Sequence, residues 1–449
     1  MQKLRLVKMN INKGAEKIIN ILEANGYEAY AVGGCVRDTI MGKTPNDWDI
    51  TTNCLPEDIV HCFEGVRIIE TGLKHGTVTL LIDDETFEVT TYRKDGAYTD
   101  NRHPDSVTFV TDLESDLSRR DFTVNAMAYN PRAGLVDLFG GREDIENKCI
   151  RCVGEANKRF EEDALRILRA LRFASVLDFT IDEDTSRAIY ELKDNLSNIS
   201  KERINCEFTK LLTGKRNVDI IREYFDVICV FIPEMADMRG FKQHNSWHVY
   251  DVMEHTLVAL SYANNDIIVR LALLLHDIAK PRMFIMDENG IGHFHGHPAV
   301  SADMAREILN RLRYDKNTIS TVVRLIKDHD NRFPPNIKSV KRMMTKLGEE
   351  NMRRLISIQL ADSSAQNPER AIQRLRDIQD ASNLINVIVE QQQAYSINQL
   401  AINGKDLIEM GIKPGPRLGE ILEELLQLVI DDKLENTRDS LISQVLKYL

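Results

Sequence analysis

Two aspartates near the amino terminus have a spacing that suits metal-assisted phosphate chemistry. Asp47 and Asp49 stand at alternate positions of a β-like stretch, residues 47–52, and the period of two points both carboxylates to one face. Two carboxylates on one face can hold a pair of Mg²⁺ ions, which activate an attacking hydroxyl and neutralise a triphosphate. Glu88, in an alternating strand pattern further along, is either a third acidic group beside the metals or an ordinary surface glutamate.

A glycine turn precedes this acidic pair. Gly33 and Gly34 stand between a short apolar stretch, residues 27–32, and a helix expected to begin near Cys35. A helix N-terminus approached by glycine backbone presents unpaired N–H groups to an anion, and Arg37 adds a charged donor there. The order of strand, glycines, helix with arginine, and strand with Asp-x-Asp therefore predicts metal-dependent nucleotidyl transfer.

Two later segments could hold a nucleotide. Residues 119–126, Arg-Arg-Asp-Phe-Thr-Val-Asn-Ala, combine cationic donors with a helix-capping signal. They suit either a ribose or triphosphate contact or a capped surface helix. Residues 162–172 open an expected helix on which every third residue is polar. The ridge consists of Asp163, Arg166, Arg169 and Arg172.

This polar ridge has two readings. It is either a solvated, salt-bridged face or a surface that reads a base. Cytosine and adenine both present an amino donor beside a ring-nitrogen acceptor, and an aspartate acceptor next to an arginine donor complements that edge. Uracil and guanine present the reverse polarity, so such a pair would refuse them.

The elements that must position these residues change in kind along the chain. Up to about residue 140, short strands alternate with helices, and from about Glu155 onward the pattern is almost wholly helical. The expected fold class is α+β, with a head of strands and helices before a helical remainder. The expected head elements are a helix over residues 15–25 closed by Gly26 and strands over 77–82 and 86–92. Breaks are expected near residues 214–216, 239–240, 331–335 and 413–416.

Composition indicates a large intracellular protein. The chain has 449 residues, of which 43% are hydrophobic and 28% charged, so it is expected to be multi-domain. No apolar run approaches the length of a membrane span, and the first residues lack the apolar segment of a secretory signal. Seven cysteines, with only Cys149 and Cys152 in CxxC spacing, favour free thiols in a reducing cytoplasm over a zinc site.

The net charge of −11 is a poor guide to nucleic-acid binding, because binding depends on local patches. Basic residues crowd the short stretch 142–172. They are Arg142, Lys148, Arg151, Lys158, Arg159, Arg166, Arg169 and Arg172. This stretch is a candidate surface for RNA.

In this order and spacing, the head motifs resemble the bacterial class II tRNA nucleotidyltransferases, which build the 3′-terminal CCA of tRNA. The motifs are residues 33–38, 47–49, 88–93, 119–126 and 162–172. The resemblance covers about residues 20–215 and continues more loosely into 400–436. It implies a polymerase-β-like nucleotidyltransferase head, template-independent addition of CCA from CTP and ATP, and binding of the tRNA 3′ end along the helical region.

The resemblance also assigns roles to matching residues. The family's Mg²⁺ ligands fall on Asp47 and Asp49. Glu88 is the further catalytic candidate, from its place in the strand pattern. The base-templating pair falls on Asp163 and Arg166. The other nucleotide contacts fall on Gly33, Gly34, Arg37, Arg120, Asp121, Asn125, Arg169 and Arg172. Trp48 departs from the small or aliphatic residue that relatives carry between the aspartates, and its side chain is expected to point away from the metals.

A second constellation is rich in histidine. Eight of the eleven histidines lie between residues 244 and 329. His276 and Asp277 are adjacent at the end of an apolar helix, with His255 about one helix upstream and Asp330 downstream. This pattern resembles the HD phosphohydrolase superfamily.

The HD resemblance implies His255, His276, Asp277 and Asp330 as metal ligands. His297 and His329 would be second-metal or phosphate-facing groups. Imidazole with carboxylate suits Mn²⁺, Ni²⁺, Fe²⁺ or Zn²⁺ rather than Mg²⁺ alone. The alternative is a degenerate HD domain that serves tRNA binding as a spacer. The expected domains are a head (1–145), a helical neck that binds RNA (146–240), an HD domain (241–360) and a helical tail (361–449).

Other functions remain open at this point. Bacterial poly(A) polymerases share the head signature but typically carry a strongly basic C-terminal extension. An HD phosphohydrolase acting on RNA 3′-phosphate or cyclic phosphate could use the head as an RNA-binding scaffold, although the intact acidic pair disfavours this. Residues 93–104 resemble a glycine-containing loop that CC-only enzymes lack, which predicts full CCA addition and leaves A-only addition possible.

Overall fold

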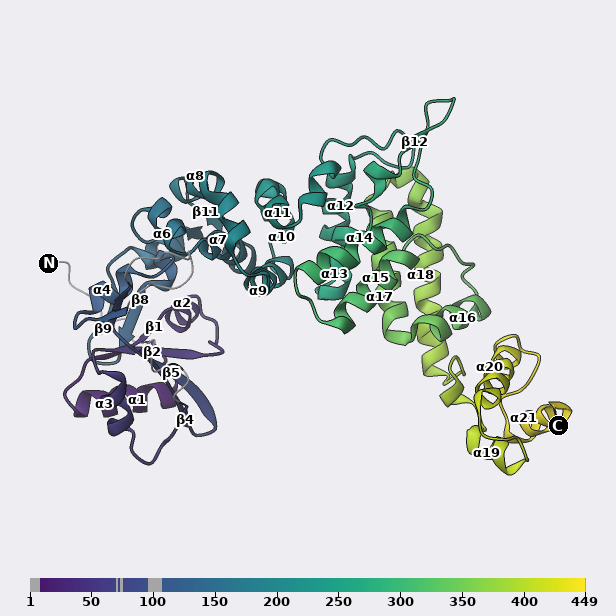
Figure 1. Cartoon of the computed structure of the whole chain (residues 1–449), viewed down its shortest axis with the longest axis horizontal. Helices are drawn as coiled ribbons and strands as arrows, with labels where there is room; N and C mark the ends of the chain where they lie inside the picture. Colours follow the sequence, from purple (N-terminus) through teal and green to yellow (C-terminus); the bar gives the residue numbers. More distant parts are fainter. Residues whose placement is uncertain (1–8, 70–71, 73–75, 96–106, 449) are drawn as a thin grey trace. The chain divides into compact units, whose positions relative to one another are not determined.

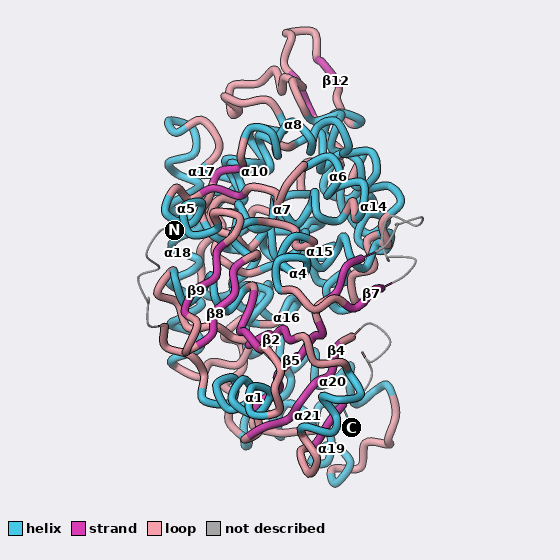
Figure 2. Tube along the Cα trace, turned by 90° about the vertical axis from the view of Figure 1, so that its left-hand side faces the viewer, coloured by secondary structure: helices cyan, strands magenta, loops and turns pink. Residues whose placement is uncertain are grey.

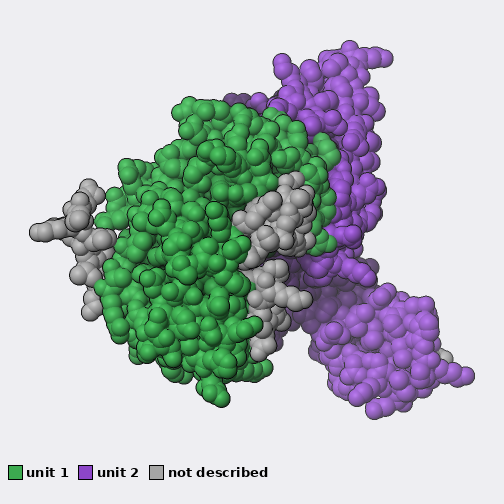
Figure 3. Space-filling view, turned by 60° about the vertical axis from the view of Figure 1, so that its left-hand side comes forward, with its two compact units in different colours: residues 1–233 green, residues 234–449 purple. Residues whose placement is uncertain are grey.

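The protein divides into two compact units. A computed structural model describes residues 9–69, 72, 76–95 and 107–448. Unit 1 spans Met1–Pro233 and unit 2 spans Glu234–Leu449 (Figure 3). The loop expected to govern ATP use lies mostly outside the described residues, which include only its first three, in strand β6 (Arg93–Asp95).

Unit 1 contains a seven-stranded sheet in the order β3-β4-β5-β2-β1-β8-β9 (Figures 1 and 2). Neighbouring strands are antiparallel except β2 and β5, which run parallel. The strands are β1 (Ala29–Val32), β2 (Trp48–Thr52), β3 (Arg67–Ile69), β4 (Thr77–Ile82), β5 (Glu85–Thr91), β8 (Met127–Asn130) and β9 (Gly134–Asp137). The expected strand over residues 77–82 is confirmed, and β5 begins one residue earlier than expected.

Helix α1 (Lys13–Ala24) covers one face of this sheet. Its apolar residues recur at helical spacing and are buried, and the Asn12 side chain caps its first turn. A Cβ at Gly14 would collide with the ring of Phe87, so α1 lies against the face of β5 to which Phe87 points. Because side chains alternate along a strand, Glu88 points to the opposite face. The acidic residues therefore lie on the side of the sheet that α1 leaves open.

The remaining helices of unit 1 are short. They are α2 (Gly34–Ile40), α3 (Pro56–Cys62), α4 (Leu113–Ser118), α5 (Gly141–Glu146), α6 (Ala156–Glu162), α7 (Leu165–Leu177), α8 (Glu183–Leu192), α9 (Lys201–Leu212), α10 (Asn217–Glu223) and α11 (Phe225–Phe231). Two-residue strands β10 (Cys149–Ile150) and β11 (Thr180–Ile181) pair in parallel, and β6 pairs with β7 (Val107–Phe109).

Two expectations for unit 1 need correction. The helix expected from residue 162 is interrupted, because Asp163 is extended (φ −141°, ψ 102°) and its carboxylate accepts a hydrogen bond from the Leu165 backbone N–H at 3.0 Å. Asp163 therefore stands between α6 and α7 rather than on the ridge of α7. The capped surface helix considered for residues 119–126 is a buried 3₁₀ turn, Thr123–Asn125.

Unit 2 is helical apart from a short ribbon of β12 (Ile285–Met286) and β13 (Gly292–His293). Its helices are α12 (Val252–Ser261), α13 (Ile267–Leu275), α14 (His297–Arg311), α15 (Lys316–Asp328), α16 (Ile337–Leu347), α17 (Glu349–Ser364), α18 (Pro368–Glu390), α19 (Gly404–Glu409), α20 (Pro416–Ile430) and α21 (Arg438–Val445). Helix α13 is apolar except for Arg270 and is buried from Ile268 to Leu275, as a central helix should be.

The breaks expected at residues 331–335 and 413–416 are confirmed, since α16 begins at Ile337 and α20 at Pro416. Residues 394–445 form a separate apolar core around α20. The expected four-domain division remains a prediction, and its boundary at residue 360 would fall inside the continuous helix α17. Over the described ranges, no helix is both long and apolar enough to cross a membrane.

Candidate functional site

An acidic cluster lies at the centre of the unit 1 sheet. Asp49 in β2 is directly opposite Glu88 in β5, so both carboxylates extend from the same face of the parallel pair. Asp47 immediately precedes β2, and its charge acts on Asp49. Trp48, between the two aspartates, is buried, which confirms that its side chain points away from them.

Electrostatics show why this cluster suits a cation. The protein atoms around the Asp49 carboxylate desolvate it, and the nearby charges of Glu88 and Asp47 repel it, so the pKa of Asp49 rises to about 6 although Arg120 opposes the change. Among the described residues, none forms an ion pair with Asp47, Asp49 or Glu88. A divalent cation bound by these oxygens would relieve the repulsion, so the residues present fit a metal site.

The glycine turn lies next to this cluster. Strand β1 pairs Val32 with Asp49, and the next residue, Gly33, has φ 81° and donates its N–H to the Met127 carbonyl. A Cβ at Gly33 would lie 3.2 Å from Nη1 of Arg120. The absence of a side chain therefore lets the Arg120 guanidinium approach the turn beside the carboxylates.

Arg37 is held inside the fold rather than left free. Its Nη1 donates to Oδ1 of Asn125 at 2.6 Å, and its Nε donates to Asp38 at 2.9 Å. The Asn125 amide in turn donates to Asp121 at 3.2 Å. Helix α2 and the 3₁₀ turn are thus joined at one end of the site by two residues that are 88 positions apart in sequence.

Two buried aspartates organise the arginines around the turn. Asp116 accepts hydrogen bonds from Arg119 at 2.7 Å, from Arg120 at 3.2 Å and from Thr51 in β2 at 3.1 Å. Asp121 accepts two hydrogen bonds from Arg169, at 2.8 and 2.5 Å. Burial alone would raise the pKa of Asp121, but the charge and hydrogen bonds of Arg169 outweigh it and lower the pKa to about 2.

The expected base-reading pair is braced by neighbours. Asp163 is held by Arg203 of α9 through contacts of 2.7 and 3.3 Å. Arg166 donates to Glu162 at 2.5 Å and to the Arg119 carbonyl at 3.1 Å. The pair is therefore held on both sides before any nucleotide binds.

Further along α7, Arg172 is paired at 2.7 Å with Glu207 and lies over the ring of Phe173, 3.5 Å from its centroid. Sequence reasoning missed Asp116, Arg203 and Glu207. Arg203 and Glu207 share a face of α9 at spacing i, i+4, but nothing in the sequence tells which residues that face meets.

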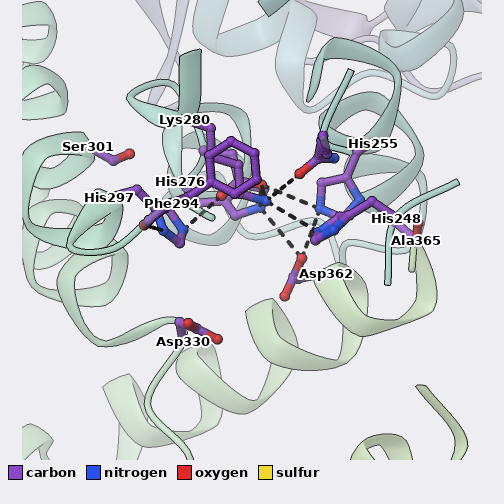
Figure 4. Close-up of polar contacts among 12 residues, drawn as sticks. His248, His255, His276, Lys280, Phe294, His297, Ser301, Asp330, Asp362 and Ala365 are labelled. Carbon is purple, nitrogen blue, oxygen red and sulfur yellow. Dashed lines mark hydrogen bonds and ion pairs between the residues drawn. The ribbon is translucent and has the colours of Figure 1, made fainter. Parts of the chain in front are cut away.

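A second cluster lies in unit 2, where imidazoles and carboxylates converge (Figure 4). Two groups have ligand atoms within 4.8 Å of one another. They are His255, His276 and Asp362, and His276, Asp277 and His329. Nε2 of His255 is 2.9 Å from Oδ1 of Asp362 and 3.5 Å from Oδ2 of Asp277. His297 joins the cluster, with Nε2 3.2 Å from Oδ1 of Asp277.

The histidine rings are oriented by the backbone. Nδ1 lies within hydrogen-bond distance of a carbonyl in four rings: His276 at 2.7 Å, His297 at 2.8 Å, His329 at 2.6 Å and His255 at 3.3 Å. A ring that donates from Nδ1 turns Nε2 toward the centre, the arrangement in which imidazoles bind metals. Nε2 of His276 and both carboxylate oxygens of Asp277 are buried without a hydrogen bond among the described residues, although the Lys280 ammonium forms an ion pair with Oδ2 of Asp277 at 2.6 Å. A metal would satisfy these atoms.

The charges of this cluster also suit a bound cation. Burial would lower the pKa of His276, but the adjacent Asp277 and Asp362 raise it to about 10. Burial, with the neighbouring His276, lowers the pKa of His329 to about 4. The two carboxylates therefore hold positive charge on His276 and on Lys280, whose Nζ is 2.6 Å from Oδ2 of Asp277, and the imidazole of His329 stays neutral.

Asp330 does not join this cluster. Its carboxylate is 3.3 Å from Nη1 of Arg374 and about half exposed, and it lies apart from the imidazoles in Figure 4. Asp362 of α17, which was not a candidate from the sequence, lies at the position in the cluster that was expected for Asp330. The sequence places several aspartates after His276, and only the packing of α17 against α12 and α13 brings Asp362 inward.

Comparison with known proteins matches both units. Three family models match, described as "Poly A polymerase head domain" (residues 29–151), "Probable RNA and SrmB- binding site of polymerase A" (178–237) and "tRNA nucleotidyltransferase domain 2 putative" (297–445). A CCA-adding enzyme of Enterococcus faecalis is 34% identical over 436 residues, 96% of this chain and 95% of the relative. One of Oceanobacillus iheyensis is 47% identical over 213 residues, 47% of this chain and 53% of the relative.

Solved structures agree. The CCA-adding enzyme of Bacillus stearothermophilus in complex with CTP superposes with a TM-score of 0.69 at 29% identity, over 97% of this chain and 96% of that one. The Thermotoga maritima CCA-adding enzyme complexed with tRNA has a TM-score of 0.57 at 20% identity, over 99% and 97% of the two chains. The latter likeness concerns the fold alone.

Proposed function

We propose that the acidic cluster of unit 1 is the active centre of this protein, since the chain belongs to the family of CCA-adding enzymes, which are metal-dependent, template-independent tRNA nucleotidyltransferases. It extends tRNA 3′ ends with C, C and A from CTP and ATP and releases pyrophosphate. The observation that carries the assignment of its centre is the pairing of Asp49 with Glu88, beside Asp47 and the Gly33 turn. Action on tRNA favours a cytoplasmic location.

Asp47, Asp49 and Glu88 would hold Mg²⁺ in unit 1. When bound, the metal supplies positive charge that activates the 3′-hydroxyl and neutralises the triphosphate. The bond from the tRNA 3′-oxygen to the α-phosphorus forms while the bond from that phosphorus to the pyrophosphate oxygen breaks, and the proton of the 3′-hydroxyl passes to solvent. The backbone at Gly33 and Gly34 and the guanidinium of Arg120 bind the phosphates beside these carboxylates, where their donors are directed at developing negative charge.

Asp163 and Arg166 would select the base. The Asp163 carboxylate accepts from the amino group of cytosine or adenine, and Arg166 donates to the adjacent ring nitrogen. Arg203 and Glu162 hold these two groups, at 2.7 and 2.5 Å. The rest of the nucleotide site would consist of side chains that are held by hydrogen bonds, namely Arg37, Asp121, Asn125, Arg169 and Arg172. A rigid protein edge can replace a nucleic-acid template, because the donor and acceptor keep their positions when either nucleotide enters.

The direct test is extension of tRNA that ends at the discriminator base, resolved to single nucleotides, with CTP, ATP or both. Addition of CC with CTP alone and CCA with both is expected. Stalling at CC with both nucleotides, or failure to start without a pre-existing CC, would contradict full CCA addition. A-only or poly(A) synthesis is not better supported, since the full-length relatives are CCA-adding enzymes.

We infer a second function in unit 2, a metal-dependent phosphohydrolase site. The observation favouring it is the convergence of inward Nε2 atoms on Asp277 and Asp362. His255, His276, Asp277 and Asp362 would hold Mn²⁺, Ni²⁺, Fe²⁺ or Zn²⁺, which suit imidazole with carboxylate. The substrate class would be an RNA 3′-phosphate or cyclic phosphate.

Metal analysis and hydrolysis assays test this second site. Asp362→Ala should lose the bound transition metal and hydrolysis of a 2′,3′-cyclic nucleotide, while CCA addition continues. Asp330→Ala is the matched control and should keep the metal. The assignment would be refuted if Asp362→Ala kept the metal content of the parent protein. It would also be refuted if the parent bound none of the four metal ions.

A further inference from the structure

A small cavity adjoins the histidine cavity of unit 2. The histidine cavity has a volume of about 520 Å³ and the small cavity about 190 Å³. Trp247, Arg332 and Arg374 line both, so the two spaces meet at these side chains. Drug-sized ligands typically fill roughly 300–1,000 Å³, so the small cavity suits one ring system and the pair of cavities suits a larger ligand.

The small cavity is lined by planar rings and positive charge. The indole of Trp247 lies near two guanidiniums, those of Arg332 at 5.7 Å and Arg370 at 6.0 Å from the ring centroid. The ring of Phe333 also lines the space. Three arginines face one carboxylate, Asp377, in the lining. Flat π surfaces beside guanidiniums are the means by which proteins stack nucleic-acid bases.

The walls of this cavity are fixed in place. The backbone carbonyl of Trp247 accepts a hydrogen bond of 2.8 Å from the N–H of Asn367, and the Asn367 amide donates to Ser246. The buried amide of Gln359 donates to the carbonyls of His329 at 3.0 Å and Asn331 at 2.9 Å. These bonds tie down both segments that carry the aromatic rings, so the pocket exists before a ligand arrives.

Arg374 stands at the junction of the two cavities. Its side chain is 11% exposed, and Nη1 is 3.3 Å from Oδ1 of Asp330. Nη2 is 3.8 Å from Oδ2 of Asp362, and it is buried without a hydrogen bond among the described residues. A buried guanidinium with a donor to spare, between a metal-type cluster and an aromatic pocket, is placed to bind a phosphate that bridges them.

We propose that the small cavity is a nucleobase subsite, so that unit 2 binds a nucleoside monophosphate unit with its phosphate at Arg374 and the histidine cluster. The unit is either a free nucleotide or the terminal residue of an RNA. This inference deepens the proposed phosphohydrolase function and rests on it for the phosphate position. The base position rests on Trp247, Phe333 and the arginines alone.

The full chain offers a direct reporter, because it has only two tryptophans, Trp48 in unit 1 and Trp247 at the subsite. Incorporation of 5-fluorotryptophan gives two ¹⁹F resonances, which Trp247→Phe assigns. The probes are 3′-AMP, adenosine and inorganic phosphate, each titrated separately. We expect 3′-AMP to move the Trp247 resonance with saturation and to bind at least about fivefold more tightly than either adenosine or phosphate.

Phe333→Ala tests the stacking contact with the reporter intact. Stacking on an aromatic side chain contributes about 1–3 kcal/mol per base, so the affinity for 3′-AMP should fall at least about fivefold while that for phosphate is unchanged. Arg376→Gln, on the same helix as Arg374 but outside both linings, is the matched control and should bind as the parent does. Equal affinity of Phe333→Ala and parent for 3′-AMP would overturn the subsite.

The remaining outcomes separate the subsite from the proposed metal site. If phosphate binds as tightly as 3′-AMP and adenosine leaves Trp247 unmoved, the base subsite is refuted while the phosphate site stands. If adenosine moves Trp247 but no metal or phosphate binds, the subsite stands and the hydrolase proposal fails. If only Trp48 responds, the ligand binds unit 1 and the subsite is refuted. A 3′-phosphorylated tetranucleotide that binds more tightly than 3′-AMP identifies an RNA end as the source.

Discussion

Substitution of Arg203 should weaken the discrimination between bases and leave metal binding by Asp47 and Asp49 unchanged. Arg203 holds both oxygens of Asp163, at 2.7 and 3.3 Å, and the two side chains are 25% and 15% exposed. A charge-assisted hydrogen bond contributes about 1.5–3 kcal/mol. Water reaches part of this pair and replaces some of that energy, so we expect Arg203→Gln to weaken transition-state binding of CTP and ATP by about 1–2 kcal/mol. That loss corresponds to about 5- to 30-fold in kcat/KM.

The loss should be selective. Asp163 without its partner can rotate away from the base edge, so the correct nucleotides lose a contact that UTP and GTP never had. Discrimination should therefore fall by the same factor, and Arg203→Lys, which keeps one contact, should recover part of it. Single-turnover incorporation of each nucleotide into tRNA ending before the CCA measures the four values of kcat/KM.

Arg132→Gln is the matched control, because it breaks an arginine–carboxylate pair, with Glu23 at 3.0 Å, that is 72% exposed on the arginine side and should have little effect. Thermal melting checks that each variant is folded. An Arg203→Gln enzyme that is folded, works within twofold of the parent and still rejects UTP and GTP would refute the bracing role of Arg203.

Three further predictions concern the metals, pH and packing. Asp47→Ala or Asp49→Ala should abolish nucleotide addition while tRNA binding, measured by filter retention, and hydrolysis in unit 2 persist; near-parental addition in either variant would contradict the assignment. The pKa of Asp49 is raised to about 6 from 3.8. Ionisation of Asp49 therefore lowers the stability of the metal-free protein as the pH rises from 4 through 6, and it has no effect on stability below pH 4. In EDTA, Asp49→Asn should therefore melt higher than the parent at pH 7.5 and no higher at pH 4, and the opposite order would refute the desolvation argument. Gly14→Ala should lower the free energy of unfolding of unit 1 by about 1–3 kcal/mol, because the added Cβ would overlap the ring of Phe87; denaturant melts check this, with Gly404→Ala, whose added Cβ meets no atom within 4 Å, as the neutral control.

The sequence determined the local features of this protein. Periodicity located β4 and the helical remainder, and the types and order of Gly33, Asp47 and Asp49 identified nucleotidyl chemistry, because strand alternation and glycine turns are short-range properties. Alternation also explains why Asp49 and Glu88 extend from the same face, given that β2 and β5 are neighbours in the sheet. Alternation also predicted correctly that Trp48 points away from the two aspartates.

Which distant residues meet depends on the packing of the whole chain. Arg203 braces Asp163 from a separate helix, Asp116 gathers Arg119 and Arg120 beneath β2, and Asp362 rather than Asp330 completes the histidine cluster. Each of these contacts depends on how helices pack, which is set by the summed burial of whole apolar faces rather than by the spacing of the polar residues themselves. The sequence therefore named the chemistry, while the partners that orient it came from packing.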